Sequence, residues 1–121
     1  MYKYYNANPR GRNVHDCTVR AISLANNKTW DATYEELCKF AQAQAIMPDD
    51  VTYIDEYLER RYDKVCDCEG MGMTVEEFIK RHPHGIYLIT MAGHITCSIN
   101  GVVYDTFDPS SRFIWEAYRV K

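Results

Sequence analysis

Hydrophobic residues follow two different spacings along this chain. In the N-terminal part they recur three and four positions apart, as in residues 51–58, which is the spacing of a helix with one buried face. From Ile86 onward they form short runs, Ile86–Met91 and His94–Ile99, that are typical of buried strands. We therefore predict an α+β fold in which N-terminal helices pack on a mostly antiparallel C-terminal sheet.

Four helices are predicted from this spacing and from polar residues at helix ends. The first covers residues 16–26, and because Arg20 is its one charged side chain after the start, we expect burial on several sides. Thr33 and Thr74 each precede a glutamate by three positions, which is the spacing of a capping box, so they are predicted to open the second and fourth helices. The third is predicted to begin at residues 48–50.

One strong turn signal organises the strands that follow. Asn100-Gly101 is a pair typical of a type I′ turn, so we predict a hairpin between His94–Ile99 and Val102–Asp105. Three further strands are predicted, at residues 2–5, 64–68 and 113–120.

Cys17 stands where a polar, loop-like segment, residues 6–13, gives way to the first helix. This position places a thiol in the first helical turn, where backbone N–H groups and the positive end of the helix dipole favour the thiolate. A small buried side chain that only fills space is the structural alternative. Because residues 13–16 before it are mostly polar, we interpret Cys17 as a candidate nucleophile.

The predicted hairpin places a histidine and a carboxylate on one face. With a two-residue turn, Ile99 pairs with Val102, and Thr96 then pairs with Asp105. Since side chains alternate between the faces of a strand, His94 shares a face with Asp105, its diagonal neighbour at about 7–8 Å between Cα atoms. We therefore predict that His94 is a general base and that Asp105 orients its ring.

Asp108 is a second candidate for the orienting carboxylate. In a regular strand it falls opposite Gly93 and on the other face, so Asp105 is preferred. A bulge at residues 106–107 would reverse the order of the two candidates.

Other polar residues are weaker candidates for chemistry. His15 lies in the loop before Cys17, and His82 and His84 flank a proline in a turn, where structural roles are commoner. Residues 66–68 contain two cysteines, but no second pair with the spacing of a zinc site accompanies them. Ser110 lacks the glycines of a nucleophile elbow. We therefore predict neither a metal site nor a serine nucleophile.

The composition fits one globular domain over residues 1–121, with 46% hydrophobic and 26% charged residues. A net charge of −3 argues against a nucleic-acid partner. No run approaches the roughly 20 apolar residues of a membrane span, and the first residues lack the apolar segment of a secretory signal. Five cysteines cannot all pair internally, so we expect a reducing, cytoplasmic setting.

At the residues above, the chain resembles papain-like cysteine peptidases of the small prokaryotic or phage type. The matching segments are Asp16-Cys17-Thr18-Val19-Arg20-Ala21, residues 85–89 and residues 93–108. The first is similar to the nucleophile helix of bacteriocin-leader peptidases. The last is similar to the His-strand-turn-strand-Asp module of those enzymes and of papain-like cell-wall endopeptidases.

This resemblance implies Cys17 as nucleophile, His94 as general base and Asp105 as orienting group. In such families a Gln or Asn shortly before the cysteine helps to form the oxyanion hole, and Asn13 is the nearest match here. In some relatives a proline follows the orienting aspartate, which points to Asp108 instead. The implied activity is hydrolysis of a peptide or isopeptide bond through a thioester. The expected substrate is a protein or peptide in a bacterial or phage-infected cell, and no cofactor is required.

Two other functions stay open at this point. A transglutaminase or deamidase uses the same three residues and the same thioester. A catalytically silent protein with a papain-like fold could instead bind a partner through exposed aromatic residues, namely Tyr2, Tyr4, Tyr5 and Tyr118. For an enzyme, the cleft walls are expected from residues 29–45 and 71–73.

Overall fold

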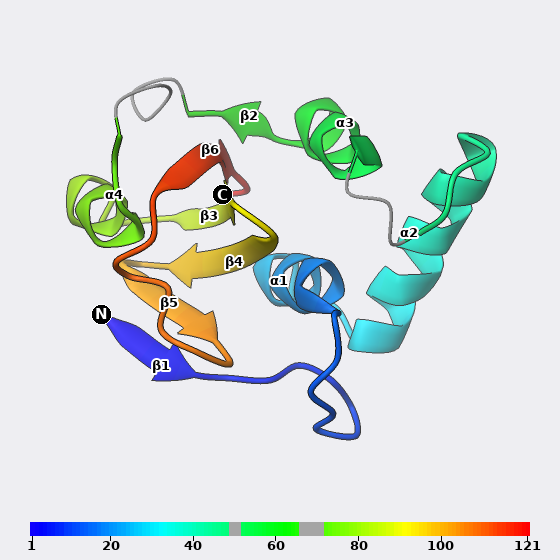
Figure 1. The fold of residues 1–121 in the computed structure, drawn as a ribbon, viewed down its shortest axis with the longest axis horizontal. Coiled ribbons are helices and arrows are strands. Elements are labelled where there is room, and N and C mark those ends of the chain that lie inside the picture. The colour runs from blue at the N-terminus through cyan, green and yellow to red at the C-terminus, as the bar shows by residue number, and fades with distance from the viewer. Residues whose placement is uncertain (49–51, 66–71) are drawn as a thin grey trace.

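The computed structural model describes residues 1–48, 52–65 and 72–121 (Figure 1). Within these ranges four helices pack on a mixed six-stranded sheet, which confirms the α+β class. The elements are, in chain order, β1 (Tyr2–Tyr4), α1 (Cys17–Ala25), α2 (Trp30–Ala43), α3 (Thr52–Arg61), β2 (Asp63–Lys64), α4 (Val75–Arg81), β3 (Ile86–Met91), β4 (His94–Ile99), β5 (Val102–Asp105) and β6 (Ile114–Arg119). None of the helices described has the length and hydrophobicity that crossing a membrane requires.

The strands lie in the order β1-β5-β4-β3-β6-β2. All neighbouring pairs are antiparallel except β1 and β5, which run parallel. The prediction of a mostly antiparallel sheet therefore holds for the C-terminal strands, and the N-terminal strand makes the sheet mixed. That strand lies beside β5, which carries Asp105 at its end.

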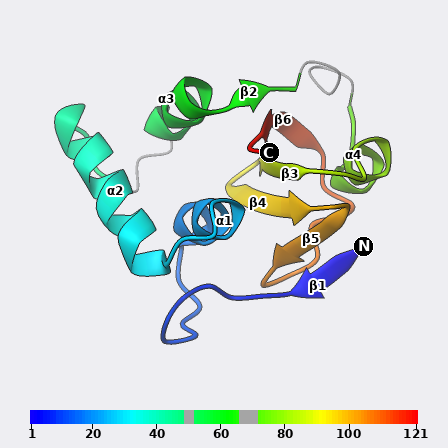
Figure 2. The same cartoon turned by 180° about the vertical axis from the view of Figure 1, so that it is seen from behind.

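Helices cover both faces of the sheet because side chains alternate along its strands. On β3, Leu88 packs with buried residues of α1, α2 and α3, whereas Tyr87 and Ile89 pack with those of α4. Seen from both sides, α1 and α4 lie on opposite sides of the sheet (Figures 1 and 2). The central strands are therefore buried on both faces, which explains why β3 reads as a continuous apolar run.

The predicted hairpin is present with the expected register. Ile99 pairs with Val102 across a two-residue turn. Asn100 and Gly101 have φ angles of 49° and 77°, as a type I′ turn requires at both central positions. β3 and β4 also have the predicted bounds. The hairpin could be predicted because its signals are local.

Two predicted boundaries fall partly outside the described residues. The expected start of the third helix at 48–50 includes 49 and 50, which are not described, and α3 is seen from Thr52. The strand expected at 64–68 is present as Asp63–Lys64, and residues 66–68 lie outside the described part.

The second helix begins earlier than its predicted capping box. Its N-cap is Thr29, whose hydroxyl oxygen accepts a hydrogen bond from the Ala32 N–H at 3.1 Å. The ring of Trp30 then stacks on Tyr34 one turn later, at 5.1 Å between centroids. Thr33 lies inside the helix with its hydroxyl buried, and that hydroxyl has no hydrogen-bond partner in the described part of the chain. The prediction of Thr33 as the cap was wrong, whereas Thr74 does cap α4.

Replacing the two threonines separately should give different results. We expect Thr29→Ala to lower the free energy of unfolding by about 1 kcal/mol, because the cap is lost. Thr33→Ala should change it by less than about 0.5 kcal/mol, because an unpaired buried hydroxyl is removed and alanine favours helix. Urea unfolding of both variants measures the difference, and equal losses would contradict the assignment of Thr29 as the cap.

Candidate active site

Cys17 and His94 are brought together by the packing of α1 against β4. Cys17 is the first residue of the helix and His94 the first residue of the strand. Cys17, His94 and Ile95 line the same cleft, and the Cys17 thiol and the His94 ring are close enough for each to shift the pKa of the other. Two residues far apart in sequence therefore meet at one end of the α1–β4 contact.

The surroundings of Cys17 favour the thiolate. Burial alone would raise the pKa of the thiol. The hydrogen bonds from His94 and from the Ile95 N–H, together with the positive charges of His94 and Arg20, outweigh burial and lower the pKa below its ordinary value. A thiol of this kind is a better nucleophile near neutral pH than an ordinary buried cysteine.

Asp105 holds the other side of the His94 ring. His94 Nε2 lies 2.6 Å from Asp105 Oδ2, and the two side chains are only 7% and 2% exposed. Burial and the hydrogen bond with His94 act on the Asp105 pKa in opposite directions, and its pKa ends below the ordinary value. An ionised carboxylate only accepts hydrogen bonds, so Nε2 carries a proton and Nδ1 is the nitrogen left for Cys17.

His94 is protonated over an unusually wide pH range. Burial disfavours the imidazolium, but the hydrogen bonds to Asp105 and Cys17 and their negative charges outweigh it and raise the pKa to about 9. The ring also lies against Phe107, at 4.7 Å between centroids. The His94 ring therefore lies between the Cys17 sulfur and the Asp105 carboxylate, and at neutral pH it carries a proton on both nitrogens.

The alternative carboxylate, Asp108, does not take this position. Asp108 is exposed and its Oδ1 accepts a hydrogen bond from the Ser110 N–H at 3.0 Å, which closes a local turn. β5 ends at Asp105 and residues 106–107 form a bend, so the strand that pairs with β4 does not reach Asp108. Of the two aspartates, Asp105 contacts His94.

The residue expected to complete an oxyanion hole is elsewhere. Asn13 is exposed in the loop before α1 and is not among the residues that line the clefts beside Cys17. Asn13 was expected from the resemblance to papain-like enzymes, and its part in an oxyanion hole stays a prediction. The Cys17 N–H at the start of α1 is the remaining donor from that prediction.

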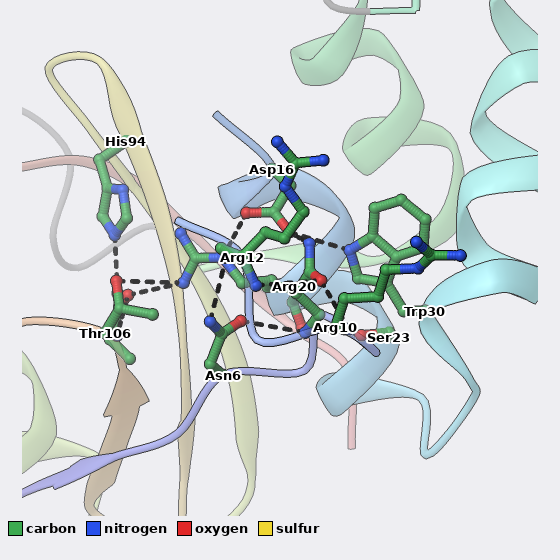
Figure 3. Close-up of polar contacts among 11 residues, drawn as sticks. Asn6, Arg10, Arg12, Asp16, Arg20, Ser23, Trp30, His94 and Thr106 are labelled. Atoms are coloured by element: carbon green, nitrogen blue, oxygen red, sulfur yellow. Dashed lines mark hydrogen bonds and ion pairs between the residues drawn. The ribbon is translucent and has the colours of Figure 1, made fainter. Parts of the chain in front are cut away.

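Asp16 and Arg20 form a buried pair that the sequence analysis did not assign to the site. Arg20 Nε donates to Asp16 Oδ1 at 2.8 Å, and Arg20 Nη1 donates to Asp105 Oδ1 at 3.2 Å. The other Asp16 oxygen accepts from the Trp30 indole N–H and from Asn8, each at 3.0 Å (Figure 3). The sequence did contain a signal for this pair. Arg20 is a charged residue in a helix with few polar residues, and it follows Asp16 by four positions, the spacing at which side chains on a helix meet.

Asp16 stands at the N-cap of α1 without capping it. Its side chain makes no hydrogen bond to the first-turn N–H groups. Both of its oxygens are taken by Asn8, Arg20 and Trp30 instead. The first-turn N–H groups of α1, beside Cys17, therefore receive no hydrogen bond from the Asp16 side chain.

Two clefts open beside Cys17. Both are lined by Cys17, Thr18, Ile54 and Gly93. The larger, about 650 Å³, has further walls from Trp30, Tyr34, Leu37, Cys38 and Met47. The smaller, about 280 Å³, continues past His94 to Asp55, Thr90, Met91 and Trp115. The expected contribution of the second helix is confirmed, whereas Gly72 and Met73 line neither cleft, and residue 71 is not described.

The weaker candidates of the sequence analysis lie away from the sulfur or have structural surroundings. His15 is exposed at the rim of the larger cleft, and His84 is exposed. His82 stacks on Phe78, with 4.5 Å between ring centroids. Within residues 1–48, 52–65 and 72–121, no three side chains are grouped to hold a metal ion, and residues 66–68 lie outside these ranges.

The exposed tyrosines proposed as an interface divide into two groups. Tyr4 and Tyr5 are exposed, as expected, whereas Tyr2 is half-buried. Tyr118 is fully buried, and its hydroxyl donates to Glu116, so its inclusion was wrong. Tyr118 lies on the face of β6 that packs with α1 to α3, which strand alternation alone did not reveal.

No protein-family model matches this chain, and no similar curated protein or solved structure was found. A function therefore has to be inferred from the side chains around Cys17.

Proposed function

We propose that this protein is a cysteine peptidase or amidase with a papain-like fold. Cys17 is the nucleophile, His94 the general acid and base, and Asp105 the group that orients His94. The observation that carries the proposal is the continuous contact from the Cys17 sulfur through the His94 ring to the Asp105 carboxylate. An activated thiolate, a base in reach and a third group behind the base are what nucleophilic cysteine catalysis needs.

The papain-like assignment is supported by chain order and by the elements involved. The nucleophile begins an N-terminal helix, the histidine begins a strand, and the carboxylate ends the next strand. The helix packs on the sheet, so that the clefts beside the sulfur run between helices and strands.

In the first half of the reaction the thiolate attacks the carbonyl carbon of an amide. A carbon–sulfur bond forms as the carbonyl electron pair moves to oxygen. The Cys17 N–H, at a helix start that Asp16 leaves uncovered, is placed to stabilise that oxyanion. The imidazolium of His94 then gives its proton to the leaving amine, the carbon–nitrogen bond breaks and a thioester remains.

In the second half a water molecule takes the place of the amine. Neutral His94 accepts a proton from the water, which attacks the thioester carbon. The carbon–sulfur bond breaks, a carboxylic acid leaves, and the thiolate and imidazolium are restored. Asp105 keeps the ring in one orientation throughout, because its carboxylate holds the Nε2 proton.

Peptide and isopeptide substrates fit the clefts better than small polar amides. The larger cleft is walled mainly by apolar and aromatic side chains, including the stacked pair Trp30–Tyr34. It continues past the sulfur into the smaller cleft, so an extended chain can lie across Cys17. The proposal includes a reducing, cytoplasmic setting, since the mechanism needs a free thiol.

The decisive experiment locates the fastest thiol. We expect limited alkylation with iodoacetamide at pH 6–7, followed by peptide mass spectrometry, to label Cys17 at least about tenfold faster than the other four cysteines. Cys97 is the internal control, because burial raises its pKa to about 12. Labelling of Cys17 no faster than that of Cys38 would remove the basis of the proposal.

Product analysis then separates hydrolysis from its alternatives. A peptide library incubated in heavy-oxygen water gives labelled carboxyl termini if peptide bonds are hydrolysed. Deamidation releases ammonia and places the label in the glutamate carboxylates that form from glutamine side chains, and transamidation joins an added amine without label. A reactive Cys17 with none of these products would favour a protein that binds peptides without cleaving them.

A further inference from the structure

Arg20 lies where it can control the geometry of the proposed catalytic residues. Its side chain is 11% exposed and extends from α1 to the end of β5. It follows Cys17 by three residues, so nucleophile and guanidinium lie on the same side of one helix, a turn apart.

The two oxygens of Asp105 are held by different partners. Oδ2 binds His94, at 2.6 Å. Oδ1 accepts from the Thr106 N–H at 2.7 Å and from Arg20 Nη1 at 3.2 Å. Arg20 Nη1 also lies 3.4 Å from the Thr106 hydroxyl. The carboxylate is therefore fixed at both oxygens, and Arg20 is the charged group that contacts the oxygen turned away from His94.

The guanidinium is itself fixed from the other side. Its Nε donates to Asp16 Oδ1, and Asp16 is held in turn by Asn8 and Trp30. One planar fork thus joins two buried carboxylates with separate nitrogens, which a lysine ammonium cannot reproduce with the same geometry.

We propose that Arg20 is a positioning residue that sets the distance between the nucleophile and the His94–Asp105 pair. One helical turn from Cys17 to Arg20, followed by the Arg20–Asp105 contact, fixes where the carboxylate stands relative to the sulfur. The inference rests on the proposed function, since it assigns Arg20 a task in the same site.

Arg20 also acts on Cys17 through its charge. Its positive charge contributes to lowering the pKa of the thiol. The titratable groups that face Cys17 and Asp105 come from every packed element. They are Tyr2 of β1, Tyr5, His15 and Asp16 of the segment before α1, Arg20 of α1, Tyr34 and Cys38 of α2, Asp55 of α3, His94 and Cys97 of β4 and Tyr104 of β5. Protonated His94 and Arg20 are the positive charges that contribute to lowering the Cys17 pKa, so removing Arg20 should make the thiolate form only at higher pH.

The test is the rate of Cys17 alkylation by iodoacetamide from pH 4 to 9 in the full-length protein. We expect Arg20→Met to move the acid limb of the profile upward by about one pH unit, so that alkylation slows by up to about tenfold on the acid side of the limb. Arg20→Lys should fall between Arg20→Met and the wild type, because it keeps the charge but not both contacts. Arg60→Met is the matched control, since Arg60 also pairs with an acid four residues earlier, on the exposed face of α3.

The readout separates positioning from a purely structural role. Both roles predict a lower unfolding temperature for Arg20→Met, because Asp16 and Asp105 lose a buried cation. A purely structural role leaves the acid limb unchanged in protein that is still folded by circular dichroism. Loss of the Arg20 charge moves the limb in Arg20→Met only, whereas loss of position moves it in Arg20→Lys as well. A folded Arg20→Met with the wild-type limb overturns the inference. If Arg20→Met is unfolded, a folded Arg20→Lys with the wild-type limb overturns it equally. A wild-type Cys17 with no enhanced reactivity would instead contradict the proposed function.

Discussion

Cys17→Ala should lose essentially all hydrolysis of a peptide library, by a factor of about 10⁴ or more in kcat/KM. The reason is that no other described group can form the thioester next to His94, and removal of a nucleophile from such a set costs about as much as removal of the whole set. Cys17→Ser should be equally inactive, because its hydroxyl does not ionise beside an imidazolium. New peptide termini counted by mass spectrometry measure the loss.

The matched control for this loss is Cys38→Ala. Cys38 is also a half-buried free thiol and lines the larger cleft, but it does not contact His94. We expect this variant to keep most of its turnover. Activity that follows Cys38 instead of Cys17 would show that the wrong thiol has been assigned.

The pH dependence of kcat/KM should have an alkaline limb near pH 9. Above this value His94 loses the proton that it must give to the leaving amine, because its pKa is raised to about 9. In Asp105→Asn the ring keeps a hydrogen-bonding partner but loses a negative charge that favours the imidazolium. The His94 pKa should then fall towards 6.5, so the alkaline limb should move down by at least about one pH unit. Rate profiles from pH 5 to 10 measure both limbs.

Asp108→Asn is the control for this shift. Its carboxylate is exposed and closes the turn at Ser110, so the profile should match that of the wild type. Ring-proton NMR of His94 in the two variants gives the same comparison without a substrate. A limb that moves in Asp108→Asn but not in Asp105→Asn would reverse the assignment of the orienting residue.

The parts of the fold that could be predicted are those with local signals. Asn100-Gly101 determines the turn, the turn determines the register, and the register places His94 and Asp105 on one face. Their contact lies within one hairpin, so alternation along two strands was sufficient to predict it. The helix start at Cys17 was also predicted within one residue, from the change in polarity.

The parts that could not be predicted depend on contacts between distant segments. The Arg20–Asp105 bond joins residues 85 positions apart, and sequence spacing says nothing about such a distance. The parallel pairing of β1 with β5 has the same origin. The cap of the second helix was predicted wrongly for a different reason. The spacing from Thr33 to Glu36 matches a capping box, but the helix starts one turn earlier, at Thr29, and Trp30 then stacks on Tyr34.

The contacts within the proposed site differ in sequence separation. His94 and Asp105 belong to one hairpin, whereas Cys17 is distant from both in sequence. The pair spans 11 residues, so closing the hairpin is a fast and local event that resembles the formation of any short β-turn unit. Cys17 must arrive from the opposite end of the polypeptide, after a loop closure that is slow and entropically costly. Incompletely folded chains should therefore hold a base with no nucleophile beside it, and reactivity of the sulfur would report completion of folding.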